Sequence, residues 1–169
     1  DSDPSRGLGD VYKRQAIMSP INDPPAEAVG LDGIEKIVRD ESLINACKDG
    51  QDLDARWNMM MASTEGAMAF SKGLGAVHSM SHAIGANQEL RLHHGTLNGV
   101  ILPTVIRFNK DHVGDKLPRI LRAMGKSESA DLADEIEKFN EKINLPSGLK
   151  EMGVTAVSYT HLRAHETDL

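Results

Sequence analysis

Apolar residues recur at helical spacing through most of this 169-residue chain, and this periodicity most constrains the fold. In one clear run, Leu132, Ile136 and Phe139 return every three or four residues with charged residues between them. Such spacing places the apolar side chains on one face of a helix. No segment between residues 16 and 155 shows a convincing strand pattern, a repeat or a low-complexity tract. The sequence therefore predicts an all-α fold, a helical bundle of about seven helices.

Proline, glycine and capping residues suggest where the first helices begin and end. A first helix is expected to begin at Pro24, because a missing N–H costs nothing at that position, with Asn22 or Asp23 as its N-cap. A break is expected at Asp40 and Glu41, after which the apolar face continues.

A second helix is expected over residues 52–71. Its large apolar side chains have helical spacing and are expected in the core: Trp57, Met60, Met61 and Met68. Another face of the same helix is built from small residues, which let a neighbouring helix approach closely: Ala62, Ser63, Gly66, Ala67 and Ala69. The histidine-bearing helix that follows is the expected neighbour.

The second half of the chain continues the helical pattern. Further helices are expected over residues 96–109, 115–125 and 129–143, with Pro103 bending the first of them. Ser147 is expected to cap a short seventh helix.

Composition excludes several classes of partner. The net charge of −6 and the pI near 5.6 argue against nucleic acid or an anionic membrane as a partner. Cys47 is the only cysteine, which excludes an internal disulfide and favours a reducing compartment. No apolar run is long enough to span a bilayer. We expect a soluble, cytoplasmic protein.

Four of the seven histidines lie between residues 78 and 94. His78 and His82 are four residues apart, so on a helix over residues 76–87 they share one face. Gly73 and Gly75 separate this helix from the one before it, but they fail the Gly-x-Gly-x-x-Gly fingerprint of a dinucleotide site. Paired histidines followed by a third imidazole can surround a divalent cation, although a lone His-x-x-x-His more often packs or faces solvent.

A longer motif favours a metal site over histidines that only pack or face solvent. Gly-x-Gly-x-x-His-x-x-x-His-x-x-Gly, from Gly73 to Gly85, is followed by His94 and Gly95. This pattern resembles the C-terminal signature of the iron-containing (group III) alcohol dehydrogenase family. The resemblance covers roughly residues 16–155 and implies the C-terminal helical domain of the dehydroquinate synthase-like fold, as a fragment of a larger enzyme.

The resemblance implies a role for each histidine. His78 and His94 match the two histidine ligands of the family's metal site. His82 matches the active-site histidine near the nicotinamide and the substrate, so it is the expected catalytic and cofactor-contacting residue. The loop before Gly95 is longer than in several members and offers both His93 and His94 as the second ligand; the glycine neighbour favours His94.

The resemblance also implies an activity and cofactors. The expected reaction interconverts an alcohol and an aldehyde or ketone by hydride transfer, with a divalent metal, Fe²⁺ or alternatively Zn²⁺, and NAD(P). The family's other metal ligands, an Asp and a His expected just before Met18, are not in this sequence, nor is the N-terminal α/β domain that binds most of the dinucleotide. The fragment itself is expected to be inactive, and the full-length protein to be a homodimer or higher homo-oligomer.

Three segments are expected. Residues 16–155 form the truncated metal-binding domain, and residues 1–15 and 156–169 are non-native or disordered tails that resemble translated adapter sequence. Two alternative functions stay open at this point: a non-catalytic helical interaction module, and a maleylacetate-reductase-like or glycerol-dehydrogenase-like relative.

Overall fold

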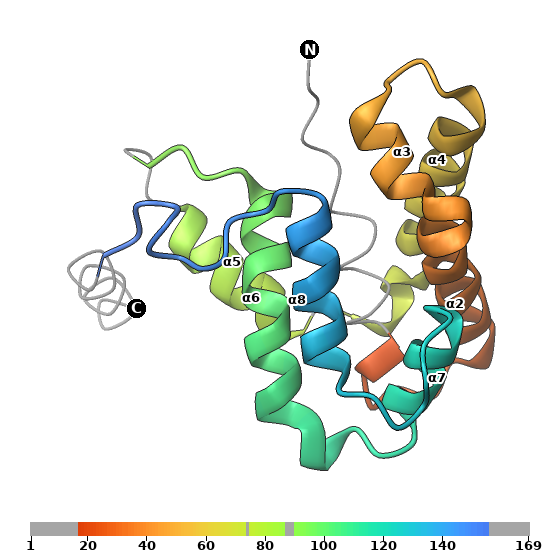
Figure 1. Cartoon of the computed structure of the whole chain (residues 1–169). Helices are drawn as coiled ribbons and strands as arrows, with labels where there is room; N and C mark the ends of the chain where they lie inside the picture. Colours follow the sequence, from red (N-terminus) through yellow and green to blue (C-terminus); the bar gives the residue numbers. More distant parts are fainter. Residues whose placement is uncertain (1–16, 74, 87–89, 156–169) are drawn as a thin grey trace.

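Helices account for the regular structure in the part of the chain that the structure describes (Figure 1). A computed structural model describes residues 17–73, 75–86 and 90–155, and the tails predicted at the two ends lie outside these residues. The α-helices are α2 (Pro24–Val38), α3 (Ser42–Lys48), α4 (Leu53–Met68), α5 (Ala76–Gly85), α6 (His94–Asn109), α7 (Lys116–Ala123) and α8 (Leu132–Lys142). Short 3₁₀ helices follow three of them: η2 (Arg39–Glu41), η3 (Ala69–Lys72) and η4 (Lys110–His112). The described residues contain no strand, so the all-α prediction is confirmed.

Several of the predicted helix boundaries are confirmed. The Asp23 carboxylate accepts a hydrogen bond of 3.1 Å from the backbone N–H of Ala26, so Asp23 is the N-cap of α2. Asp40 and Glu41 have φ angles of 49° and 54°, and this left-handed backbone separates α2 from α3. Gly73, with a φ of 82°, ends η3 in a conformation that a residue with a Cβ would resist.

The helices form two groups around a main core and a smaller cluster of Ile37, Leu43 and Ala62 (Figure 1). Helix α4 packs against α2 and α3, whereas α6 packs against α5 and α8. The main core joins both groups through buried residues of α2, α5, α6, α7 and α8, among them Ile34, Val77, Leu97, Ile120 and Ile136. The histidine-bearing α5 is thus held on one side by α6.

Two expectations about α4 were wrong. Trp57, Met60 and Met68 are 57%, 67% and 60% exposed, so they lie on the surface and not in the core. The small face of α4 is buried instead, at Ala62 and Gly66, and it packs against α2, not against the histidine helix. Both faces have helical spacing, and close helix packing selected the face with small side chains.

Some boundaries in the second half differ from the predictions. Helix α6 begins at His94 instead of residue 96 and continues through Pro103. Helix α8 begins at Leu132, with Asp131 as its N-cap. The short helix expected after Ser147 is replaced by turns, in which the Glu151 carboxylate accepts hydrogen bonds from the backbone N–H and the hydroxyl of Ser147.

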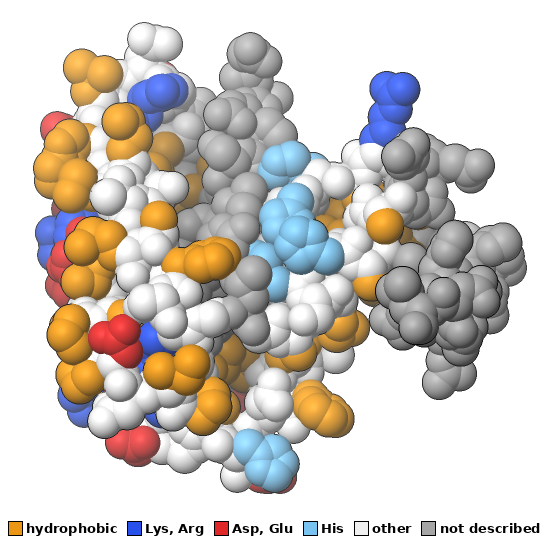
Figure 2. All heavy atoms as spheres, turned by 180° about the vertical axis from the view of Figure 1, so that it is seen from behind, with side chains coloured by type: hydrophobic (Ala, Val, Ile, Leu, Met, Phe, Trp, Pro, Cys, Tyr) orange, Lys and Arg blue, Asp and Glu red, His pale blue; other side chains and the backbone are white. Residues whose placement is uncertain are grey.

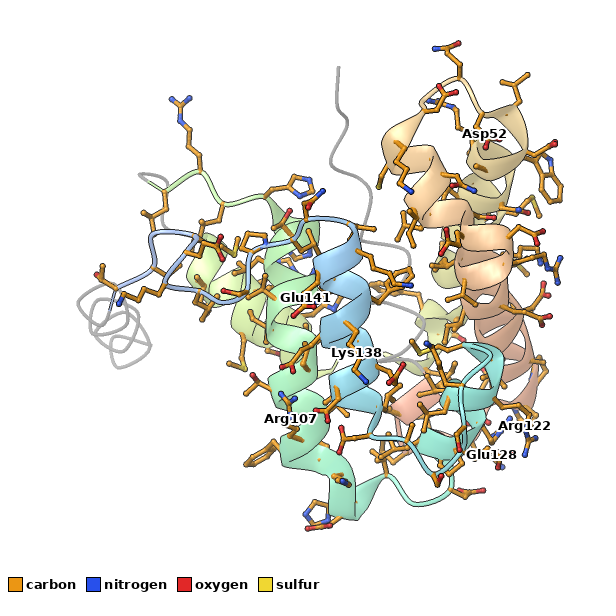
Figure 3. All side chains as sticks on the ribbon, viewed as in Figure 1. Asp52, Arg107, Arg122, Glu128, Lys138 and Glu141 are labelled. Carbon is orange, nitrogen blue, oxygen red and sulfur yellow. The ribbon has the colours of Figure 1, made fainter. Side chains whose placement is uncertain are left out.

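Ion pairs tie helices together both at the surface and in the interior. Arg107 of α6, labelled in Figure 3, donates hydrogen bonds of 2.6 and 2.7 Å to Glu137 of α8. In the interior, Glu27 of α2 pairs with Lys72, whose side chain is fully buried, and with Arg119 of α7 at 2.7 Å. Because Lys72 directly precedes Gly73, this buried pair anchors the segment that leads into α5. None of the described helices is long and apolar enough to cross a membrane.

Candidate metal and hydride-transfer site

Helix α5 presents two histidines along one face but at different depths. Its N-cap, Gly75, provides no side-chain cap, and His78 and His82 follow within the ten-residue helix. His78 is only 1% exposed, whereas His82 lies on the exposed side. The predicted i, i+4 pair therefore leads from the interior to the surface.

The two adjacent histidines at the N-terminus of α6 have different structural roles. The His93 ring is the N-cap of α6: its Nδ1 accepts a hydrogen bond of 3.3 Å from the backbone N–H of Thr96 and lies 3.2 Å from the Thr96 hydroxyl. His94 is the first residue of the helix and is half-buried. His93 therefore caps α6, and the ring of His94 is left for the candidate site.

Three imidazole rings meet between α5 and α6. The ring centroids of His78 and His94 are 5.3 Å apart, those of His82 and His94 are 4.9 Å apart, and those of His78 and His82 are 6.2 Å apart. Figure 2 shows histidine side chains grouped on one face of the molecule. The structure thus brings together the three histidines to which the family resemblance gives roles in the site.

Burial keeps the innermost ring neutral. The pKa of His78 is lowered to about 4, mainly by burial and also by the neighbouring His94 and His82, because a second positive charge would be repelled. Burial is also the main cause of the lowered pKa of His94, followed by repulsion from His82. At neutral pH both rings are therefore neutral, which is the form that binds a metal ion.

The distances between these rings suit two ligands of one metal ion, but two ligands do not make a complete site. With metal–nitrogen distances of about 2.0–2.1 Å, two imidazoles on one tetrahedral ion have ring centroids about 5 Å apart. The 5.3 Å between His78 and His94 fits this spacing, and so does the 4.9 Å between His82 and His94. Within the described part of the chain, however, no group of three or more His, Cys, Asp or Glu side chains is arranged to hold a metal ion. The two imidazoles need further donors to complete a site.

Asn98 is a polar residue of this site that sequence reasoning missed. It lies one turn after His94 on α6, is fully buried, and its Nδ2 is 3.4 Å from Nε2 of His78. Its Oδ1 has no hydrogen-bond partner. The His94-x-x-x-Asn98 spacing repeats the spacing of His78 and His82, and this signal was available in the sequence.

The fold is thus an all-helical domain in which two packed helices, α5 and α6, bring three imidazole rings together. Residues 16–166 match the family described as Fe-containing alcohol dehydrogenase family, C-terminal. The chain belongs to this family, and within it corresponds to the C-terminal part.

Known relatives agree with this assignment. The chain is 45% identical over 148 residues to the 4-hydroxybutyrate dehydrogenase of Cupriavidus necator, covering 83% of this chain and 38% of that protein. It is 33% identical over 156 residues to alcohol dehydrogenase 4 of Saccharomyces cerevisiae, covering 89% of this chain and 40% of that protein. Its fold is similar to the crystal structure of a 1,3-propanediol oxidoreductase, with a TM-score of 0.84 and 28% identity over 93% of this chain and 42% of that one. The chain thus spans about two fifths of the length of these relatives.

Proposed function

We propose that this chain is the helical, metal-binding part of an NAD(P)-dependent alcohol dehydrogenase that interconverts an alcohol and an aldehyde or ketone by hydride transfer. The observation that carries the proposal is the convergence of the His78, His82 and His94 rings at the junction of α5 and α6. Membership of the iron-containing family supports it and disfavours a non-catalytic interaction module.

His78 and His94 are the proposed metal ligands. Their lowered pKa values keep both rings unprotonated at neutral pH, and their centroid spacing of 5.3 Å suits two ligands of one ion. A divalent cation bound there would polarise the oxygen of the substrate as a Lewis acid. The remaining donors and most of the NAD(P) site would come from outside this chain.

His82 is the proposed catalytic residue, in contact with the substrate and the nicotinamide. It lies on the exposed side of α5, and its ring centroid is 4.9 Å from that of His94. A ring at this position can orient the substrate and give or take a proton at its oxygen without being a ligand.

Similarity to named relatives guides the remaining assignments. The 45% identity to a 4-hydroxybutyrate dehydrogenase makes 4-hydroxybutyrate the first substrate to test. We propose Fe²⁺ as the metal, with Zn²⁺ as the alternative, because histidine sites bind several divalent ions and availability often decides. We also propose that the complete enzyme is a cytoplasmic homodimer or higher homo-oligomer.

A chimera tests these roles. Residues 16–155 would replace the corresponding part of the Cupriavidus necator 4-hydroxybutyrate dehydrogenase, and four variants would be compared by metal content and steady-state rate: His78→Ala, His94→Ala, His82→Ala and His93→Ala. We expect the first two to lose metal and turnover together, since each removes a ligand. His82→Ala should keep the metal and lose about 10²- to 10⁴-fold in rate.

His93→Ala is the matched control, because it removes the neighbouring ring that caps α6. We expect it to keep the metal and most of the activity. If His93→Ala strips the metal and His94→Ala does not, then His93 is the ligand and the assignment is wrong. If every variant retains metal, the proposed site is wrong.

A further inference from the structure

The exposed face of α4 carries a regular stripe of residues. Leu53, Trp57 and Met60 are 76%, 57% and 67% exposed, and Thr64 and Ala67 continue the stripe in exposed positions. The steps between successive members are four, three, four and three residues. This alternation is typical of the seam between two helices that pack along their length. Figure 2 shows hydrophobic side chains exposed on the same face of the molecule as the group of histidines.

The opposite face of α4 is already covered. Ala55 and Ala62 are 4% and 1% exposed and lie on the side of α4 where α2 and α3 pack. Ala69, at the start of η3, is fully buried and again lies seven residues further on. Seven residues are close to two helical turns, so the three alanines share one face. The exposed stripe lies on the other face and does not contribute to the packing of α4 within the chain.

The exposed area of this stripe is large enough for a dimer interface. Taking about 200 Å² for a fully accessible large apolar residue, the exposed fractions of Leu53, Trp57, Met60 and Met68 leave about 500 Å² uncovered. A specific protein–protein interface buries about 800 Å² on each partner. These four side chains would provide most of that area, and the exposed polar residues beside them would provide the rest.

The stripe is complementary to a second copy of itself that runs in the opposite direction. Its large side chains, Leu53, Trp57 and Met60, precede its small ones, Thr64 and Ala67. An antiparallel pair of α4 helices brings Met60 opposite Thr64, and Trp57 opposite Ala67, of the second copy. A parallel pair would instead place Trp57 against Trp57 and leave a gap at Ala67. Close packing and opposed helix dipoles both favour the antiparallel pair.

Charge does not oppose this contact. The chain has a net charge of −6, so two copies repel each other at long range. Within α4, however, the exposed charged residues are one acid and one base, Asp54 and Arg56. The face is therefore neutral, as the core of an interface usually is.

We propose that α4 is the docking surface for a second copy of this chain, which packs antiparallel along the stripe and covers Trp57. This inference rests on the proposed function in one respect, because it names a surface for the homo-oligomer proposed there. It does not depend on the metal site, so metal retention in the chimera and association through α4 can fail separately.

Sedimentation velocity of the metal-free 169-residue chain over a concentration series measures the association. We expect the apparent mass to rise from 18.4 kDa toward twice that value, and the emission of Trp57 to shift to shorter wavelength with it. Trp57→Glu should raise the dissociation constant of the dimer by about 30-fold or more, because it places a charge in the centre of the interface.

Phe108→Glu is the matched control, since Phe108 is 83% exposed but lies on α6, outside the stripe. It should leave the dissociation constant unchanged. A chain that stays monomeric at every concentration would leave the stripe to another part of the longer enzyme and would overturn the proposal. A dimer that Trp57→Glu does not weaken would also overturn it.

Disulfide trapping tests the direction of the pairing, with Cys47→Ser in every chain. We expect a mixture of Met60→Cys chains and Thr64→Cys chains to form mixed disulfide dimers on mild oxidation, because these positions face each other across the antiparallel pair. Each variant alone should form few. Disulfide dimers of each variant alone, without mixed ones, would show a parallel pair and overturn the proposal.

Discussion

At the scale of single residues, burial distinguishes the histidines of the candidate site. His78 is 1% exposed and is kept neutral because its charged form would lose hydration there. His82 lies four residues further along the same helix and is exposed. Two residues of one type, one turn apart, therefore have different chemistry because they lie at different depths.

The lowered pKa of His78 predicts a pH-dependent stability of the metal-free chain. Its pKa is about 4 when folded, against an ordinary value of 6.5, so the unfolded chain takes up the proton first as the pH falls. The stability contributed by neutral His78 is complete above the unfolded pKa and is lost as the pH falls toward the folded value. Between pH 7 and pH 5 we expect a loss of about 2 kcal/mol in the free energy of unfolding.

Urea unfolding at both pH values in the presence of a chelator measures this loss. His78→Gln should remove that part of the pH dependence, whereas His112→Gln, at an exposed histidine, should keep it. Equal pH dependence in the two variants would contradict the prediction.

At the scale of helices, the carboxylate of Glu27 connects three elements. It pairs with Lys72 of η3, with Arg119 of α7 at 2.7 Å, and more distantly with Lys116 of α7 at 3.8 Å. The hydrogen bond from Lys72 is the main cause that lowers the pKa of Glu27, with Arg119 adding to it. This carboxylate therefore holds the start of α2, the end of η3 and α7 together.

Glu27→Gln should destabilise the chain strongly, because it leaves the buried Lys72 without its counter-charge. We expect a loss of about 3–5 kcal/mol at pH 7. Because the pKa of Glu27 is lowered, its contribution is present above the ordinary value of 4.5 and is lost as the pH falls through the folded value. The variant should therefore lose less stability than the unsubstituted chain on acidification below pH 4.5.

Glu35→Gln is the control for this change. Glu35 lies on the same helix and forms an exposed i, i+4 pair with Arg39 at 3.2 Å. Such pairs contribute about 0.3–0.5 kcal/mol. Similar losses in Glu27→Gln and Glu35→Gln, measured by urea unfolding, would show that the buried pair contributes little.

The exposed face of α4 predicts how the single tryptophan behaves. Trp57 is 57% exposed and is the only tryptophan in the chain, so in the dilute, monomeric chain its fluorescence should have the long-wavelength maximum of a hydrated indole and be quenched by iodide. Trp57→Ala should change the free energy of unfolding by about 0.5 kcal/mol or less. Ile34→Ala, at a fully buried position of α2, should cost about 2–5 kcal/mol. A short-wavelength, protected tryptophan would show that this face is covered.

At the scale of the whole molecule, the proposed function gives this chain one side of a catalytic site. It brings imidazoles together at the α5–α6 junction, but its Gly73-x-Gly75 segment continues into His78 and lacks the third glycine of a dinucleotide fingerprint. The relatives that it matches are more than twice as long as the part that it covers. Hydride transfer needs both the metal and the nicotinamide in one place, so a single part is not sufficient.

We therefore expect the purified 169-residue chain to show no NAD(P)-dependent oxidation of 4-hydroxybutyrate, with or without added Fe²⁺ or Zn²⁺. Two imidazoles leave most coordination positions of a cation to water, so metal binding should also be weak. Absorbance of the reduced nicotinamide at saturating cofactor measures turnover. The chimera is the positive control; turnover by the chain alone would contradict the prediction.

The sequence by itself determined the helical class, several of the breaks between helices and the placement of His78 and His82 on one face of a helix, because these depend on local spacing and capping. The motif from Gly73 to Gly95 also indicated the family, since its glycines and histidines are close together in the chain.

Only the tertiary structure decided which side chains are buried. Both faces of α4 have helical spacing, and the choice between Trp57 and Ala62 for the interior depended on how closely α2 approaches. Likewise, the contact of Asn98 with His78 arises only when α5 and α6 pack. Burial and the pKa values that follow from it belong to the packed molecule, because desolvation depends on all neighbours of a residue and not on those next to it in sequence.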